Sequence, residues 1–405
     1  MEKIKDLGFP NIWFLLFFPL AILGSAALNI YLVITSLFII YHIYKTKIFL
    51  KIIDNLWAKL FILFYLFILV NSFFAIDVFS SIKSSGSQIR FFLFSIFLMY
   101  FLKIDKLPII LRILSVLNIL VCFDTIFQHF NGTDIFGLTA DPINNPNRLS
   151  GPFGKELIVG SFLYQSSLII FSYYIFSDTK VKYEKIYRIF YCVLIISTIV
   201  LSGERMNSIL IILTTFMMIF LKFKKLQKVY AITFFLSFIA IFYSFSDVAK
   251  IRLNDFKREV SQVHHSNHGK IFSSAYDIWK KNFLSGVGLK NFRIVCDQEV
   301  VHSVTGKKNL CSTHPHNFYF EFLSETGLIG LLLFLSFVIS ILWKSLKKII
   351  LTKEPIMIGC FIILFFYIFP VRSSGSFFST WYASFFWLHL GVLLCYLNNF
   401  KKYNA

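Results

Sequence analysis

Long hydrophobic runs separated by short polar segments dominate this chain. A helix needs about 20 apolar residues to cross the hydrocarbon core of a bilayer, and twelve segments come close to that length. They lie at roughly 9–24, 27–44, 57–76, 87–102, 107–130, 156–177, 186–201, 206–221, 229–246, 318–343, 355–370 and 377–397. The pattern predicts an all-α, polytopic membrane protein with about 12 transmembrane helices.

The composition narrows the class of protein further. The chain is 57% hydrophobic and 15% charged, and 52 of its 405 residues are Phe. Soluble globular chains carry about 25% charged residues, and one water-soluble core could not bury so many aromatic side chains. A soluble enzyme, a disordered chain and a small disulfide-stapled protein are therefore excluded.

The net charge of +19 changes meaning once the hydrophobic segments are placed. In a soluble protein this excess would indicate nucleic acid binding, but here the basic residues crowd into alternate short loops, as at 222–228. By the positive-inside rule these loops and both termini are cytoplasmic. Two longer loops, at 131–155 and 247–317, are then outside, and no nucleic acid partner is expected.

The sequence predicts three regions in chain order. Residues 1–246 form a transmembrane bundle, 247–317 form the large outer loop, and 318–405 contain the C-terminal spans. The loop is expected to be partly helical, because Phe272, Ala275, Trp279 and Phe283 recur at spacings of three and four.

Two cysteines, Cys296 and Cys311, share the large outer loop. An oxidising outer compartment would allow a disulfide between them. Two free thiols are one alternative. Another is a zinc site completed by His314 and His316, although this spacing fits no standard zinc motif. We expect the disulfide and no metal.

A His-Pro-His-Asn stretch, His314 to Asn317, lies directly before the long apolar segment that begins near 318. Imidazole titrates near neutral pH and can accept a proton from a hydroxyl group. Asn317 and the first free N–H groups of the following helix could bind an anion. The alternative is that Asn317 only caps the helix.

Several arginines lie at the outer ends of predicted spans or in outer loops. Glu204 and Arg205 join two apolar segments, where charged side chains are costly unless they have partners or face water. Arg presents a planar fork that suits phosphate oxygens, but Glu204 and Arg205 could also form an internal network. Arg90, Arg148 and Arg372 would complete a site for an anionic headgroup if they surrounded one cavity; otherwise each anchors a span at the interface.

These residues resemble the bacterial O-antigen ligase and polymerase superfamily. Its ligases share a pattern of His, then Asn, Ser or Gln, then nine residues, then Gly-x-x-Gly. Here His316-Asn317 is followed by nine residues and by Gly327-Leu-Ile-Gly330. The turn at 202–205 resembles the family's Ser/Gly-rich turn ending in Arg, and 286–292 resembles its Gly-x-Gly…Phe stretch.

The resemblance implies an inverting glycosyltransferase of the bacterial inner membrane with a periplasmic active site and no cofactor or metal. The donor would be a glycan on undecaprenyl diphosphate. A ligase transfers this glycan to lipid A–core, and a polymerase transfers it to another glycan repeat. His316 matches the family's essential histidine and would act as the base, Arg205 matches its turn arginine, and Arg293 is our choice for its loop arginine.

A ligase is favoured over a polymerase because the chain has one dominant outer loop, whereas polymerases of the superfamily tend to have two of comparable length. A lipid-linked glycan flippase or transporter is less favoured, since the charges lie at the outer rim and not along a midplane pathway. The predicted partners are the donor, the acceptor and membrane lipids. The predicted substrate-binding residues are Arg205, Arg293, His314, Asn317, Arg90 and Arg372.

Overall fold

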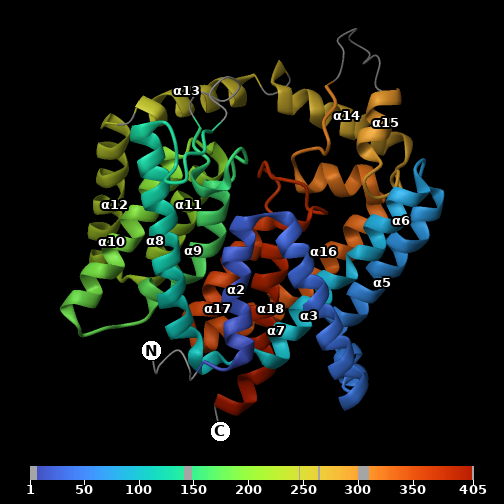
Figure 1. Cartoon of the computed structure of the whole chain (residues 1–405), viewed down its shortest axis with the longest axis horizontal. Helices are drawn as coiled ribbons and strands as arrows, with labels where there is room; N and C mark the ends of the chain where they lie inside the picture. Colours follow the sequence, from blue (N-terminus) through green and yellow to red (C-terminus); the bar gives the residue numbers. More distant parts are fainter. Residues whose placement is uncertain (1–6, 141–147, 246, 263–264, 300–309, 404–405) are drawn as a thin grey trace. The chain divides into compact units, whose positions relative to one another are not determined.

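The computed structural model describes residues 7–140, 148–245, 247–262, 265–299 and 310–403, almost all of them in helices or the turns between helices (Figure 1). The chain packs into two compact units. The first contains Met1–Gly24, Lys103–Val260 and Thr352–Ile363, and the second contains Ser25–Leu102, Ser261–Leu351 and Leu364–Ala405.

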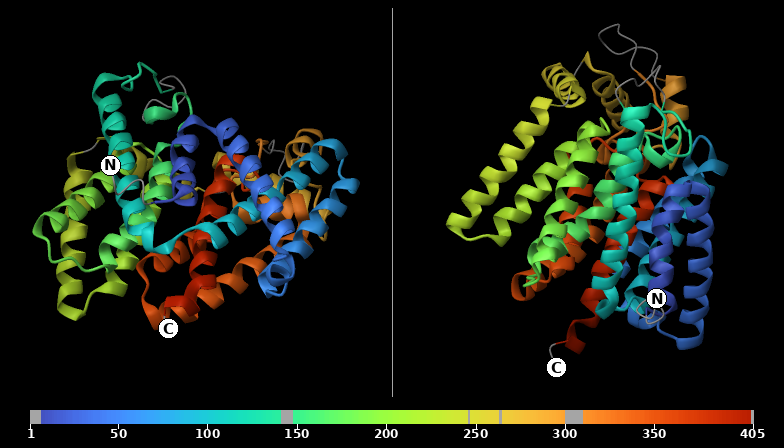
Figure 2. Two further views of the ribbon diagram at one scale, coloured as in Figure 1. Left: turned by 60° about the horizontal axis from the view of Figure 1, so that its bottom comes forward. Right: turned by 60° about the vertical axis from the view of Figure 1, so that its left-hand side comes forward.

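The first unit is a bundle in which α8 to α11 lie side by side and α12 packs against α11 (Figures 1 and 2). Its buried polar side chains bond to one another, as where Ser166 Oγ donates to Asn118 Oδ1 at 2.9 Å. Its helices are α2 (Phe9–Leu23), α8 (Leu107–Asn131), α9 (Val159–Phe176), α10 (Lys182–Leu201), α11 (Arg205–Lys222), α12 (Lys225–Phe245), most of α13 (Asp247–Ser261) and the first part of α17 (Pro355–Tyr367).

In the second unit α7 packs against both α3 and α18. An aromatic core runs through this unit, in which Phe334 lies 4.8 Å from Phe322 and 5.0 Å from Phe377 between ring centroids. The unit's helices are α3 (Ser25–Thr46), α4 (Phe49–Ile53), α5 (Leu56–Asn71), α6 (Val78–Ser87), α7 (Ile89–Phe101), α14 (Asn267–Lys281), α15 (Phe292–Glu299), α16 (Phe318–Thr352) and α18 (Thr380–Tyr403).

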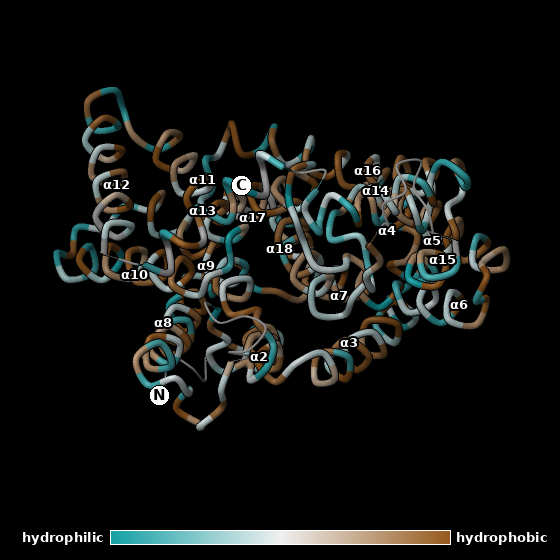
Figure 3. Tube along the Cα trace, turned by 90° about the horizontal axis from the view of Figure 1, so that it is seen from above, coloured by the Kyte–Doolittle hydropathy of each residue, from teal (hydrophilic) through white to brown (hydrophobic). Residues whose placement is uncertain are grey.

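Each of the twelve predicted hydrophobic segments overlaps a helix, and long hydrophobic stretches are visible along the helices in Figure 3. Among the described residues, seven helices are long and apolar enough to cross a membrane: Ser25–Thr46, Leu56–Phe74, Ile104–Asn131, Val159–Phe176, Arg205–Lys222, Phe318–Thr352 and Thr380–Asn399. Two shorter apolar helices are Phe9–Leu23 and Pro355–Tyr367. The protein is therefore all-α with several candidate spans, and the count of twelve stays a prediction.

The segment predicted as the large outer loop contains α14, as its periodicity predicts, and also α15, which the periodicity did not predict. The buried stripe of α14 differs from the expected one. Its buried residues are Ile271, Ser274, Ala275 and Ile278. Trp279 is only half-buried and Phe283 is exposed. Ala275 of the predicted stripe is thus buried, whereas Ile271 and Ile278, each one position before a predicted aromatic residue, are buried in place of Phe272 and Trp279.

The two glycine motifs pack against each other. Helix α16 is broken at Gly327, whose φ is 64°, and Gly286 has a φ of 67°. A Cβ on Gly327 would lie 2.3 Å from the Leu284 carbonyl, and one on Gly286 would lie 2.5 Å from the carbonyl carbon of Glu325. Only glycine fits such backbone contacts. Four backbone hydrogen bonds join the segments, from the N–H groups of Val287, Gly288, Leu328 and Ile329 to the carbonyls of Ser324, Glu325, Phe283 and Leu284.

Candidate active site

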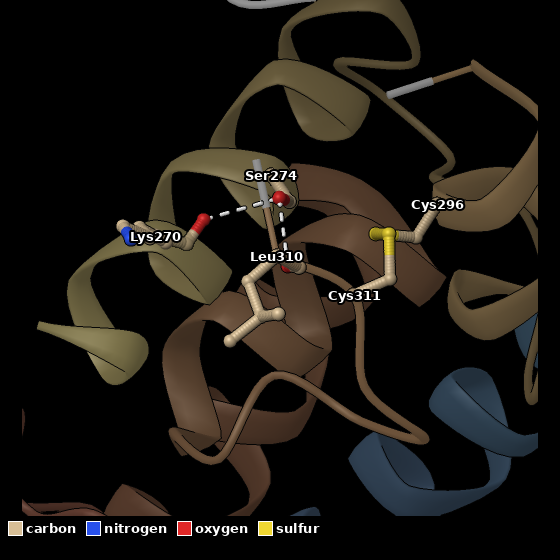
Figure 4. The surroundings of a disulfide bond; sticks show 5 residues. All are labelled: Lys270, Ser274, Cys296, Leu310 and Cys311. Atoms are coloured by element: carbon tan, nitrogen blue, oxygen red, sulfur yellow. Dashed lines mark hydrogen bonds between the residues drawn. A yellow bond between two sulfur atoms is a disulfide. The ribbon is translucent and has the colours of Figure 1, made fainter. Parts of the chain in front are cut away.

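The segment that carries the histidines is covalently fixed. A disulfide joins Cys296 in α15 to Cys311, which precedes the histidines in the chain (Figure 4). On the α14 side, Ser274 Oγ donates to the Leu310 carbonyl at 3.1 Å (Figure 4). Because the sulfur atoms of Cys296 and Cys311 are bonded to each other, they supply no thiolates for the zinc site considered above.

His316 has a left-handed backbone, with a φ of 57°. This conformation costs about 1–3 kcal/mol for a residue other than glycine, and it persists only where the surroundings enforce it. The Ser374 N–H donates to the His316 carbonyl at 2.9 Å, and the next residue caps α16. Strained backbone of this kind clusters at functional sites.

The His316 ring lies among polar and aromatic neighbours. Its Nε2 lies 3.1 Å from Ser312 Oγ. The His314 ring lies 4.0 Å away and the His268 ring 5.4 Å away, between centroids. His268 in turn stacks on Phe272 of α14. The structure therefore holds a hydroxyl group at hydrogen-bond distance from one imidazole nitrogen.

His314 and His316 are both neutral at physiological pH. Burial lowers the pKa of His316 to about 4, helped by the charge of His268. Burial also lowers the pKa of His314 to about 3, helped by the charges of His316, Lys290 and Arg293. A neutral imidazole has a lone pair that can accept a proton, which the charged form lacks.

Asn317 serves as a cap and a clamp. Its Oδ1 accepts from the backbone N–H of Tyr319 at 2.9 Å, which satisfies the start of α16. Its Nδ2 donates to the carbonyls of Pro370 and Arg372, at 2.8 and 3.1 Å. Both ends of this buried amide are engaged within the protein, so the capping alternative describes its observed contacts and a direct substrate contact stays a prediction.

Arg372 is buried and 3% exposed. Its guanidinium lies over the Tyr367 ring at 4.6 Å, and Nη1 donates to the Phe366 carbonyl at 3.2 Å. It thus stabilises the segment that also receives the clamp of Asn317. These contacts place Arg372 in the support of the histidine segment, and its predicted role in substrate binding stays untested.

A chain of polar contacts leads from the buried acid Glu321 to Lys290. Ser376 Oγ donates to Glu321 Oε1 at 2.5 Å, and the Phe377 N–H donates to Oε2 at 2.7 Å. Lys290 Nζ donates to Ser376 Oγ at 2.9 Å. Lys290 has a left-handed backbone, with a φ of 64°. Its ammonium group is therefore fixed by hydrogen bonding in place of being free in solvent.

Lys290 lines a polar cavity of about 600 Å³ in this unit, which we call the basic cavity. Four cationic side chains and several neutral polar ones line it, and the full lining is Asn29, Asp77, Ser80, Lys83, Ser84, Ser87, Arg90, Lys290, Arg293 and Ile294. Two predicted substrate-binding residues, Arg90 and Arg293, are thus brought together at one cavity. The charges of Lys290 and Arg293 also reach His314, which links this end of the cavity to the histidines.

The first unit holds the Glu204-Arg205 turn. The Glu204 carboxylate is buried and accepts from Gly160 N at 2.7 Å, Ser161 Oγ at 2.8 Å and Asn207 Nδ2 at 2.7 Å. Burial raises the pKa of Glu204, and the charge of Arg148 opposes this. Neutral donors thus satisfy the carboxylate, and the turn that presents the next residue is rigid.

Arg205 begins α11 and lines a cavity of about 160 Å³ in the first unit, which we call the apolar cavity. Its walls are mostly aliphatic and aromatic side chains of α10 to α13, among them Ile196, Ile212, Phe238 and Phe256. A guanidinium in the lining of a mostly apolar cavity suits a ligand with an anionic head and a hydrocarbon tail.

The part of the chain that contains the glycine motifs and the histidines matches a known protein family. Residues 190–335 match the family model for O-antigen ligase. This segment belongs to the O-antigen ligase and polymerase superfamily. No curated protein matches the chain significantly. The O-antigen ligase segment contains Arg205, both glycine motifs, His314 and His316.

Three residues of the O-antigen ligase segment that the sequence did not single out as site residues are Ser312, His268 and Lys290. Ser312 and His268 lie against His316, and Lys290 bridges Glu321 to the basic cavity through Ser376. The position of Lys290 two residues after the Gly286-Val287-Gly288 turn was the one available signal. The other two are polar loop residues that only the folded chain brings to the histidine.

Proposed function

We propose that the protein is an O-antigen ligase-like enzyme that transfers a glycan from undecaprenyl diphosphate to a sugar hydroxyl of lipid A–core. We place the reaction at the periplasmic face of a bacterial inner membrane, with both termini cytoplasmic. The match to the O-antigen ligase family supports the enzyme class. The observation that carries the proposal is the neutral, rigidly held His316, whose Nε2 already lies 3.1 Å from a hydroxyl oxygen.

In the proposed reaction His316 Nε2 takes the proton of the acceptor hydroxyl. The acceptor oxygen then attacks the anomeric carbon of the donor and forms the new glycosidic bond. The bond from that carbon to the diphosphate oxygen breaks, and undecaprenyl diphosphate leaves with the electron pair. One displacement of this kind inverts the anomeric configuration. The displacement requires a base for the acceptor proton and groups that stabilise the anionic leaving group.

Cationic side chains would stabilise the charge that develops on the diphosphate. Fixed donors in a water-poor site stabilise such charge more than bulk water does. Lys290 and Arg293 are the candidates beside the histidines, since their charges reach His314. Arg205 keeps the role that the family resemblance implies, which is binding of the donor through its anionic head. In this scheme Asn317 and Arg372 position the histidine segment.

Deletion of the gene in its host tests the function. Loss of a ligase should leave long polymer on undecaprenyl diphosphate and bare lipid A–core, visible as loss of the ladder on a lipopolysaccharide gel. Loss of a polymerase should instead leave core that carries a single repeat. The polymerase is the second candidate because the matched family and the same histidine chemistry serve both reactions. A ladder identical to wild type would contradict both candidates.

A further inference from the structure

The proposed reaction does not account for most of the basic cavity. Lys290 and Arg293 lie at the end that reaches the histidines electrostatically. The remaining wall comes from α6 and its N-cap Asp77, from Asn29 of α3 and from Arg90 in the first turn of α7. This wall presents hydroxyl groups and two cations to a space of about 600 Å³, which lies within the roughly 300–1,000 Å³ typical of small-molecule sites.

Helix α6 carries serines on two faces, one buried in the protein and one that lines the cavity. Ser81 and Ser85 are fully buried, and Ser85 Oγ lies 2.7 Å from Ser72 Oγ. Ser80, Ser84 and Ser87 line the cavity at spacings of four and three residues, which places them on one face of the helix. The cavity wall is therefore a row of hydroxyl groups, with Lys83 and Arg90 beside it.

The walls of the cavity are held in place. Asn291 ties the Lys290 segment to the start of α6, because its Oδ1 accepts from the Asp77 N–H at 2.7 Å. On the other side Arg90 Nη2 donates to Thr380 Oγ1 at 3.2 Å, and Thr380 Oγ1 donates to Asn29 Oδ1 at 3.1 Å. The cavity is thus preformed, which reduces the cost of ordering on binding.

The mixture of groups does not suit a diphosphate alone. Asp77 also lines the cavity, and its carboxylate would repel a ligand with several negative charges. A carboxylate, an amide and three hydroxyl groups are instead the partners that sugar hydroxyls require. The two cations of this wall, Lys83 and Arg90, add a preference for a single anionic group.

We propose that the α6 wall of the basic cavity binds an acidic sugar of the glycan, that is, a sugar ring carrying a carboxylate or a phosphate group. The proposal rests on the proposed function, because it takes a glycan to be the substrate. It adds a class of sugar that neither the family match nor the histidine chemistry specifies. The anionic group lies against Lys83 and Arg90, and the ring hydroxyls lie against the serines and Asp77.

Direct binding tests the proposal without any transfer reaction. The full chain in phosphatidylcholine nanodiscs, whose lipids carry no net charge, is titrated by calorimetry with glucuronic acid, glucose 6-phosphate and glucose. One added charge-assisted hydrogen bond should make an acidic sugar bind about tenfold more tightly than glucose. Glucuronic acid and glucose 6-phosphate distinguish a carboxylate from a phosphate as the anionic group.

Variants locate the binding. Lys83→Gln should weaken the acidic sugar by about tenfold and leave glucose unchanged. Ser84→Ala should weaken acidic and neutral sugars alike, by less than tenfold, because it removes a contact to the ring. The control is Lys344→Gln, which removes an exposed lysine of α16 outside the cavity lining and should change neither affinity.

The outcomes separate this proposal from the proposed function. Acidic sugars that bind no more tightly than glucose, or affinities that Lys83→Gln does not change, would overturn the proposal. Inorganic pyrophosphate that binds tightly and is weakened by Lys83→Gln, with no preference for acidic sugars, would assign the cavity to the diphosphate and also overturn it, while the transferase function stands. Selective binding in a protein that transfers no glycan from an undecaprenyl diphosphate donor would support the site and contradict the function.

Discussion

Predicted substrate-binding arginines line two cavities, and the linings of these cavities differ in polarity and in charge. The basic cavity has a single aliphatic side chain in its lining, Ile294, and four cationic ones. The apolar cavity has one charged side chain, Arg205, among mostly hydrocarbon walls. Its volume of about 160 Å³ compares with about 600 Å³ for the basic cavity. Both linings contain arginine, and the surroundings decide what each arginine can bind.

This difference divides the proposed work of the enzyme. A polar cavity with several cations favours a hydrated, polyhydroxylated and anionic ligand, whereas an apolar cavity with one guanidinium favours a lipid whose anionic head lies against the guanidinium and whose hydrocarbon lies against the walls. We therefore expect substitutions at His316 to lower kcat, substitutions in the α6 wall of the basic cavity to weaken binding of the sugar, and substitutions at Arg205 to raise the KM for the lipid-linked donor.

The largest effect is expected at His316. His316→Ala should lower kcat by about 10²- to 10⁴-fold and leave the donor KM nearly unchanged, because a general base contributes to the chemical step. His316→Gly should be as inactive as His316→Ala but no less stable than that variant, since glycine adopts the left-handed backbone without strain. Transfer assays in membranes and thermal unfolding of the purified protein measure the two quantities.

The matched control is His265→Ala, which removes an exposed histidine of the same unit. Its activity should stay within about twofold of wild type. A near-normal kcat in His316→Ala would show that His316 is not the base. It would also contradict the separate roles proposed for His316 and Arg205.

Two buried glycines, one in each unit, should also differ in their tolerance of an added methyl group. A Cβ on Gly327 would lie 2.3 Å from backbone atoms of Leu284 and would require a positive φ, so Gly327→Ala should cost roughly 3 kcal/mol or more. Gly160 of the first unit has no positive φ, and its nearest obstacles are side-chain atoms, namely Ser202 Oγ at 2.8 Å and Glu204 Cβ and Cδ at 3.1 Å. Gly160→Ala should therefore cost only about 1 kcal/mol, because a side chain can move.

Thermal unfolding in detergent measures the ranking. Gly375→Ala is the control in the second unit, since the nearest atom to its added Cβ would be Tyr382 Cδ2 at 3.6 Å. It should unfold at the temperature of wild type. An unfolding temperature for Gly327→Ala equal to that of the Gly375 variant would show that the two glycine motifs do not support each other as the hydrogen bonds indicate.

A tenfold effect is expected for Arg205→Lys. Lysine keeps the charge but loses the planar fork that binds two phosphate oxygens at once, so the donor KM should rise by about tenfold while kcat changes less. Arg112→Lys is the control, because Arg112 is an exposed arginine of the same unit in an ion pair with Glu184. If Arg205→Lys lowers kcat and leaves the donor KM unchanged, Arg205 acts on the chemical step and the division fails.

The sequence predicted the helices better than their surroundings. Each predicted helix coincides with an apolar segment of near-bilayer length. Such a segment can be recognised from neighbouring residues alone. The spacing from His316 to Gly327 indicated the family, which the match over residues 190–335 confirmed. What the sequence could not predict is the partner of each motif. The contact of Gly327 with Leu284 and the bond from Lys290 to Ser376 join residues far apart in the chain, and no local pattern encodes them.

The arginines show the same limit. Arg90, Arg205 and Arg372 were predicted together, as arginines at the outer ends of spans. The structure separates them into one that lines the basic cavity, one that lines the apolar cavity and one that is buried over Tyr367. A side chain's environment depends on the packing of several helices, so an arginine that binds a ligand and one that supports a loop look alike in sequence.

The smallest expected effect tests how the second unit keeps His316 neutral. After burial, the second cause of its low pKa is the charge that His268 carries when protonated. His268→Gln removes that charge, so the pKa of His316 should rise above about 4. Only the neutral form accepts a proton, so kcat/KM falls as the pH drops through this pKa, and in the variant the fall should begin at a higher pH. His265→Gln is the control. A pH profile unchanged by His268→Gln would leave burial as the sole cause and would place His268 in packing against Phe272 alone.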